Sequence, residues 1–138
     1  MADPQPFVLL DDARAEGASD AQLFEAPRAV FVARRPEDVL PVLEAADAAR
    51  RETGGTLAGY LAYEAGLALE PKLAPRAVDR TGANGPLLWF GLFDAAECIP
   101  AAEVPRWLAE RAGDAPASIG PLDPQISTGA YLEAFAAL

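Results

Sequence analysis

The sequence predicts an α+β fold with mostly antiparallel strands and helices on the outside. Apolar runs of strand length alternate with segments of helical period, and turn-forming residues separate most of them. The run at residues 87–93 is the most hydrophobic and lies between Pro86 and Asp94, which predicts a buried central strand. A length of 138 residues corresponds to one domain or part of one.

The N-terminal third predicts strands joined by short loops. Expected strands cover residues 7–10, 23–25 and 30–32, and the last two form a hairpin across residues 26–28. Asp11 and Asp12 stop the first strand, because aspartate favours turns. The small and polar residues 13–21 predict a loop.

A helical period begins at Pro36, where apolar residues recur at positions 39, 40, 43 and 46. Acidic residues come early and Arg50 and Arg51 late, which suits the helix dipole, and Gly54 or Gly55 ends the helix. Pro41 predicts a kink or a separate first turn at residues 36–40, since proline lacks the N–H of a helix interior.

The middle of the chain predicts a strand at residues 57–63, where Gly59 allows another backbone to approach closely. A short helix follows at residues 64–70 and ends at Pro71, and residues 76–86 form a loop. A further helix is expected at residues 102–112 with Gly113 as its stop.

The last predicted helix begins after Ser127 or Thr128 and carries Tyr131, Phe135 and Leu138 on one face. An isolated helix of this length is unstable in water, so this face needs a partner. Either the helix packs against the rest of this chain in a compact domain, or the chain is truncated where a larger domain begins. We favour truncation, with an N-terminal region at residues 1–124 and the start of a second domain at 125–138.

Composition excludes several classes of function. The net charge of −10 opposes binding to nucleic acid, and no apolar run approaches the length of a membrane span. The N-terminus lacks the charge and apolar stretch of a signal peptide, so we expect a cytoplasmic protein. The chain has no histidine, which excludes histidine-based catalysis and histidine metal ligands. Its one cysteine, Cys98, predicts a small buried side chain.

The residues alone reveal no catalytic set. Asp11 and Asp12 more often close a turn than bind a ligand, and Glu64 more often forms an ion pair with an arginine or Lys72 than acts in catalysis. The glycines do not form a phosphate-binding loop. Trp89 and Trp107 are expected to fill a core.

Three blocks nevertheless occur in a recognisable order: residues 7–12 (FVLLDD), 59–65 (GYLAYEA) and 86–94 (PLLWFGLFD). Together they resemble the N-terminal region of aminodeoxychorismate synthase component I, in the chorismate-utilising family that also contains anthranilate synthase component I. The segment from Pro121 and the helix from Tyr131 resemble the junction where the chorismate-binding domain of that family starts.

The resemblance implies the N-terminal part of a layered β-sandwich that further residues complete. It also implies a transferase that binds chorismate and Mg²⁺ and takes ammonia from a glutaminase subunit. The product, 4-amino-4-deoxychorismate, leads to 4-aminobenzoate and folate. Chorismate and magnesium ligands of the family lie beyond Leu138, so no catalytic residue is assigned and this chain alone is expected to be inactive.

One family site falls within this region. A Leu-Leu-Glu-Ser pattern at the end of the first strand holds tryptophan in many relatives, and Leu9, Leu10, Asp11 and Asp12 stand at those positions. Two adjacent carboxylates would attract the ammonium of an amino acid but repel its carboxylate, which favours loss of tryptophan feedback. We take Leu10, Asp11, Asp12 and Tyr60 as a candidate amino-acid pocket; Tyr63 is a further candidate, with core packing expected for at least one tyrosine.

Two alternatives remain open. The chain can belong to anthranilate synthase component I, although Asp11 and Asp12 argue mildly against that enzyme because tryptophan feedback is expected there. It can also be a non-enzymatic acidic binding module whose last helix docks in a groove of a partner.

Overall fold

The computed structural model describes residues 5–79, 85–113, 118–121, 123–124 and 126–137. The strands are β1 (Val8–Leu10), β2 (Ala21–Phe24), β3 (Ala29–Ala33), β4 (Thr56–Leu61), β5 (Leu88–Phe93) and β6 (Glu97–Ile99). The α-helices are α1 (Pro36–Thr53), α2 (Ala65–Leu69), α3 (Val104–Ala112) and α4 (Thr128–Ala136). Two compact units, residues 1–107 and 108–138, are described separately below.

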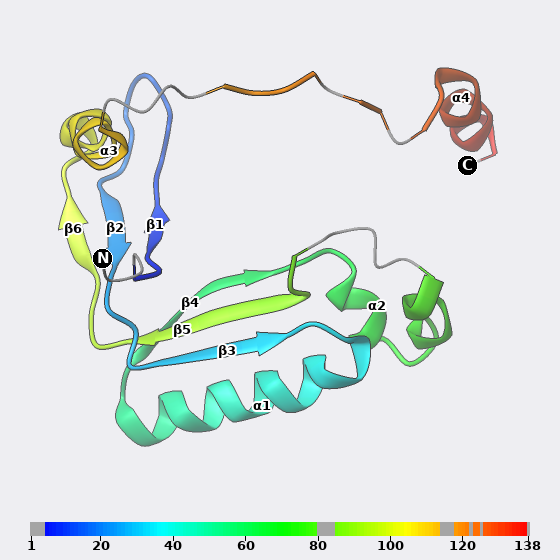
Figure 1. Cartoon of the computed structure of the whole chain (residues 1–138), viewed down its shortest axis with the longest axis horizontal. Coiled ribbons are helices and arrows are strands. Elements are labelled where there is room, and N and C mark those ends of the chain that lie inside the picture. The colour runs from blue at the N-terminus through cyan, green and yellow to red at the C-terminus, as the bar shows by residue number, and fades with distance from the viewer. Residues whose placement is uncertain (1–4, 80–84, 114–117, 122, 125, 138) are drawn as a thin grey trace. The chain divides into compact units, whose positions relative to one another are not determined.

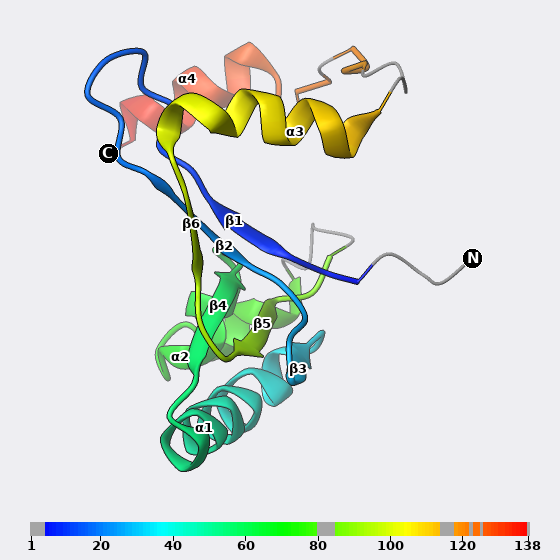
Figure 2. The same cartoon turned by 90° about the vertical axis from the view of Figure 1, so that its left-hand side faces the viewer.

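The first sheet has the strand order β1-β2-β6, and both strand pairs are antiparallel (Figure 2). Strand alternation places Ala21 and Leu23 of β2 on the same face as Ile99 of β6, and all three are buried. Val104 and Trp107, from the first turns of α3, pack on this face. The first sheet is therefore stabilised on one side by a helix, as the α+β prediction requires.

The second sheet has the order β3-β5-β4, again fully antiparallel, with β5 in the centre (Figure 1). Helix α1 covers one face, where Val39 packs with Ala33 and Leu88 in a cluster of fully buried side chains. The prediction that residues 87–93 form a buried central strand is confirmed for Leu88–Phe93.

Strand β5 also contributes to a second core on its other face. Phe93 is fully buried and packs with Phe24 of the first sheet and Ala58 of β4. The rings of Phe24 and Phe93 lie 5.5 Å apart between centroids, a favourable separation for an aromatic pair. The two sheets of residues 1–107 thus share a core, and α1 lies on the far face of the second sheet.

The predicted hairpin between residues 23–25 and 30–32 is wrong. Both strands exist, but β2 pairs with β1 and β6, whereas β3 pairs with β5 over five residues from Ala29 to Ala33. The connection turns through Ala26, whose φ of 52° lies in the left-handed region, and carries the chain from one sheet to the other. Tertiary pairing with an apolar strand outweighs the local pairing of two neighbours.

Helix α1 is a single helix from Pro36 to Thr53 with Pro41 inside it, so a separate first turn is wrong. Gly54 ends the helix with a φ of 71°, and its N–H donates to the carbonyl of Arg50, which confirms the predicted stop. Arg50 and Arg51 both pair with Asp47, as expected for charges on the surface of a helix end.

Three shorter predictions need adjustment. Strand β4 begins at Thr56 and ends at Leu61, so Tyr63 lies outside it. The predicted loop at 76–86 begins within a 3₁₀ helix, Ala74–Asp79, and its residues 80–84 lie outside the described residues. Cys98 is exposed rather than buried, because alternation along β6 turns Ile99 to the core and Cys98 away from it.

The second unit contains helix α4, which begins at the predicted cap. The hydroxyl of Ser127 accepts a hydrogen bond from the N–H of Ala130 at 3.2 Å. Tyr131, Leu132 and Phe135 are all exposed, and no described residue of α4 is buried. Leu138, the last residue of the predicted stripe, lies outside the described residues.

The coarse prediction of an α+β fold with antiparallel sheets is confirmed. In the part of the chain that the structure describes, no helix combines the length and the apolar character needed to cross a membrane. The expected division of the chain at residues 124 and 125 stays a prediction.

Gly59 offers a test of the pairing between β4 and β5. A Cβ at this position would lie 2.0 Å from the carbonyl oxygen of Trp89 and 2.8 Å from Cα of Phe90. Gly59→Ala should therefore lower the free energy of unfolding by about 3 kcal/mol, the upper range for overpacking. Chemical denaturation followed by circular dichroism measures this change.

The matched control is Gly66→Ala in α2, where a Cβ would meet nothing within 4 Å. This substitution should leave stability unchanged or raise it by up to about 1 kcal/mol, because alanine favours a helix over glycine. Equal effects of the two substitutions would contradict the close approach of β4 to β5.

Candidate functional site

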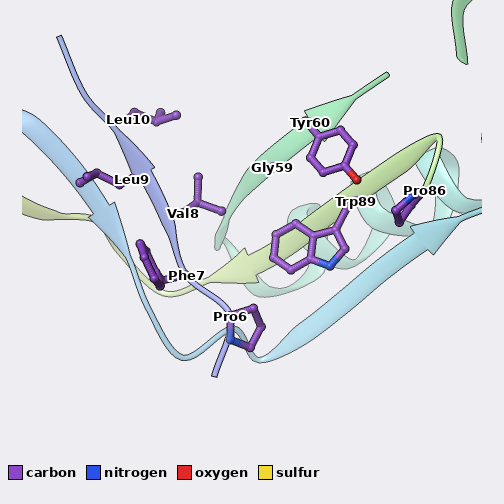
Figure 3. A pocket seen from close by; sticks show the side chains of 9 residues that line it. All are labelled: Pro6, Phe7, Val8, Leu9, Leu10, Gly59, Tyr60, Pro86 and Trp89. Carbon is purple, nitrogen blue, oxygen red and sulfur yellow. The ribbon is translucent and has the colours of Figure 1, made fainter. Parts of the chain in front are cut away.

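Residues 1–107 contain an apolar cleft with a volume of about 570 Å³ (Figure 3). Its described lining residues are Pro6, Phe7, Val8, Leu9, Leu10, Gly59, Tyr60, Pro86 and Trp89. They come from β1 and the residues before it, from β4, and from β5 and the residues before it. The volume falls within the range of small-molecule sites.

The register of the second sheet explains why Tyr60 and Trp89 meet in this cleft. They are direct partners in the pairing of β4 with β5, so their side chains share the face that points away from α1. Figure 3 shows the two rings side by side, with β1 across the cleft from them. The prediction that Trp89 fills a core is met in part, because it packs against the cluster of Phe24, Ala58 and Phe93 but is only half-buried and also lines the cleft.

The cleft offers few polar groups. Among the described residues that line it, the side-chain hydrogen-bonding groups are the hydroxyl of Tyr60 and the indole N–H of Trp89, and no side chain is charged. Apolar surface dominates, so burial of an apolar ligand would provide the main driving force for binding. A charged group placed deep in this cleft would lose hydration without gaining an oppositely charged partner among the described lining residues.

Asp12 belongs to a separate structure, the loop after β1. Its carboxylate accepts two hydrogen bonds from Nε of Arg14, at 2.9 and 3.1 Å, and one from Nη2 at 2.6 Å. It also accepts a hydrogen bond from the N–H of Ser19 at 3.0 Å, which closes the loop. These bonds lower the pKa of Asp12 from 3.8 to about 2, with Arg14 as the largest cause.

The four residues of the candidate amino-acid pocket therefore divide into two groups. Leu10 and Tyr60 line the same cleft. Asp11 and Asp12 are not among its described lining residues, and the carboxylate of Asp12 is already bound to Arg14. Asp11 is exposed directly after Leu10. Among the described residues, the cleft therefore has an apolar lining without the two carboxylates of the candidate pocket.

Tyr63 and Glu64 lie in a different, smaller cavity of about 170 Å³, together with Leu67, Leu73 and Arg76. Tyr63 is 91% exposed and Tyr60 is 45% exposed, so neither tyrosine packs in a core as expected for at least one. The predicted ion pair of Glu64 is not found among the described residues.

Metal ligands are the remaining question at this site. The described residues bring together no group of three or more His, Cys, Asp or Glu side chains that could hold an ion. The Mg²⁺ that the family resemblance implies is expected to bind beyond Leu138 and stays a prediction, so no chemical step is derived through a metal here.

Several lining residues were missed in the sequence, namely Pro6, Phe7, Val8, Gly59, Pro86 and Trp89. For Trp89, strand alternation predicts which side chains of its own strand share its face, but not which residue of another strand lies opposite it. With β4 and β5 paired as they are, Trp89 lies opposite Tyr60, but the register of a pair of strands separated by 26 residues of chain is not set by local sequence.

No protein-family model, no curated protein and no solved structure matches this chain.

The pKa of Asp12 provides a direct test of the loop. Because its pKa is about 2 in the folded chain and 3.8 ordinarily, the carboxylate stabilises the fold above pH 4 and loses this effect as the pH falls through 2. Titration of the Asp12 carboxyl carbon by NMR should give a midpoint near the lower value.

Arg14→Gln removes the charged donor and should raise the Asp12 midpoint toward its ordinary value while leaving the cleft unchanged. A midpoint near 3.8 in the unaltered chain would contradict the observed hydrogen bonds. An unchanged midpoint in the variant would assign the shift to a cause other than Arg14.

Proposed function

We propose that this chain is the N-terminal region of aminodeoxychorismate synthase component I, acting in the cytoplasm. The full enzyme would replace the 4-hydroxyl of chorismate with an amino group, using ammonia from a glutaminase subunit and Mg²⁺ bound outside this chain. The residues that carry the chemistry would lie in a chorismate-binding domain that follows, so the role proposed here is structural support and ligand binding.

One observation carries this proposal. The three sequence blocks that resemble the family are far apart in the chain, yet all three line one cleft. Residues 7–12 contribute Phe7 to Leu10, residues 59–65 contribute Gly59 and Tyr60, and residues 86–94 contribute Pro86 and Trp89. Only Pro6 of the described lining residues lies outside the blocks. If the three blocks form one site in the family, their sequences would be expected to stay similar among its members.

The layered arrangement also supports the proposal at the coarse level. Two antiparallel sheets share a core around Phe24 and Phe93, and one helix covers the outer face of the second sheet. The resemblance implies a β-sandwich of this general kind, completed by further residues. The specific fold of the chorismate-utilising enzymes is part of the proposal.

The loop of Asp12 bears on the choice between the two related enzymes. Since Asp12 binds Arg14 and Ser19, its carboxylate is occupied within its own loop. A tryptophan in the cleft would find no charged group for its ammonium or carboxylate among the described lining residues. This supports loss of tryptophan feedback, and so aminodeoxychorismate synthase over anthranilate synthase.

The proposal is tested by reading the coding DNA past the codon for Leu138 and assaying its product. We expect an open frame of roughly 300 further residues, or two domain lengths, that encodes a chorismate-binding domain. The full protein should convert chorismate, ammonia and Mg²⁺ to 4-amino-4-deoxychorismate, whereas the 138-residue chain should not.

Two results would contradict the proposal. A stop codon directly after Leu138 would leave the non-enzymatic acidic module as the better hypothesis. Formation of anthranilate by the full protein would assign the chain to anthranilate synthase component I instead.

A further inference from the structure

The cleft runs along the backbone edge of β1, as the identity of its lining residues shows. Successive side chains of a strand point to opposite faces, so a pocket on one face touches alternate residues. Here Val8 packs into the core shared by the two sheets, whereas Leu9 packs into the core beneath α3. Both nevertheless line the cleft, together with Leu10. Because consecutive residues from both faces of β1 border the cleft, the cleft lies beside the edge of this strand and not over one of its faces.

This edge of β1 has no partner strand among the described residues. In the order β1-β2-β6, β1 is terminal and pairs only with β2. Across the cleft, β4 is likewise terminal in its own sheet and pairs only with β5. Terminal strands of natural proteins usually carry charged residues or proline that discourage pairing. Neither Val8–Leu10 nor Thr56–Leu61 contains one within its bounds, and Pro6 and Asp11 lie just outside the three residues of β1.

We propose that the cleft accepts an extended segment of a partner polypeptide, which pairs with β1 as an additional strand of the first sheet. Main-chain hydrogen bonds to the open edge would provide affinity, and alternate side chains would enter the apolar space against Tyr60 and Trp89. A small apolar molecule would fill that space but leave the backbone groups of β1 without a bonding partner.

Charge indicates the chemistry of this partner. The chain carries a net charge of −10, and the exposed Asp11 follows the last lining residue of β1. The carboxylate of Asp11 makes no ion pair within the described residues, in contrast to Asp12. A lysine or arginine at the end of the added strand would be attracted to it, whereas a second copy of this chain would be repelled by its like charge.

The test uses the 138-residue chain and a peptide of about six residues, the usual length of a strand. The peptide alternates valine or phenylalanine with threonine and ends in lysine. We expect saturable shifts of the backbone amide signals of Val8 and Leu10 in NMR spectra, with slowed hydrogen exchange in β1.

A backbone control separates strand addition from simple apolar binding. The same peptide with N-methyl groups at alternate residues keeps its side chains but cannot form the full set of strand hydrogen bonds. Its affinity should fall at least about tenfold. Equal affinity of the two peptides would overturn the proposal and assign the cleft to apolar ligands, and so would the absence of saturable shifts with the first peptide.

Two protein variants provide a matched pair. Leu10 and Leu40 are exposed to nearly the same extent, 51% and 52%, but only Leu10 is among the residues that line the cleft. Leu10→Ala should weaken binding by about threefold to tenfold, and Leu40→Ala in α1 should leave it unchanged. Equal weakening would place the peptide elsewhere, which overturns the proposal. Native-like amide spectra of both variants confirm that they fold.

Charge is tested with a peptide that ends in glutamate and with Asp11→Asn. The glutamate peptide should bind more weakly than the lysine peptide, and Asp11→Asn should reduce this difference. Equal binding of both peptides would overturn the basic character of the partner. Dimerisation of the chain alone, with protected β1 amides, would identify the occupant as a second copy and overturn the proposal as well.

Discussion

The structure of residues 1–107 depends on burial of both faces of strand β5. Leu88 packs beneath α1, and Phe93 packs between the two sheets, so one strand of six residues contributes to two cores. Complete burial of a large apolar side chain stabilises a fold by about 1.5–3 kcal/mol. The strands β3 and β4 must therefore pair with β5 in one register. A shift of either strand by one residue would move its side chains to the opposite face of the sheet.

That constraint also determines the cleft. With the register fixed, Tyr60 and Trp89 lie on the face that points toward the first sheet, and β1 meets this face through Val8. Gly59 permits the close approach of β4 to the backbone at Trp89. The cleft thus lies between β1 and the pair of strands β4 and β5, next to the core that the two sheets share. Its lining is apolar because the pairing of β4 with β5 leaves the rings of Tyr60 and Trp89 partly uncovered.

Local features of the fold were predictable from sequence, and long-range pairing was not. The strand at 87–93 and the helix from Pro36 to Gly54 follow from apolar patterning, capping and charge order. The supposed hairpin failed because β2 and β3 find their partners elsewhere in the chain, which no local signal encodes. Leu10 and Tyr60 of the candidate pocket line the cleft, whereas Trp89, which also lines it, was not singled out from the sequence, since its exposure depends on how the second sheet meets β1.

The convergence of β1, β4 and β5 on one cleft is most directly tested by nuclear Overhauser effects in the 138-residue chain. We predict contacts from the methyl groups of Val8 to the indole of Trp89, since these side chains pack against the same core of Phe24, Ala58 and Phe93. The protons of the Tyr60 ring should also show contacts to Trp89, its partner in the sheet. Absence of contacts between Val8 and Trp89 in a folded sample would contradict the cleft and the account built on it.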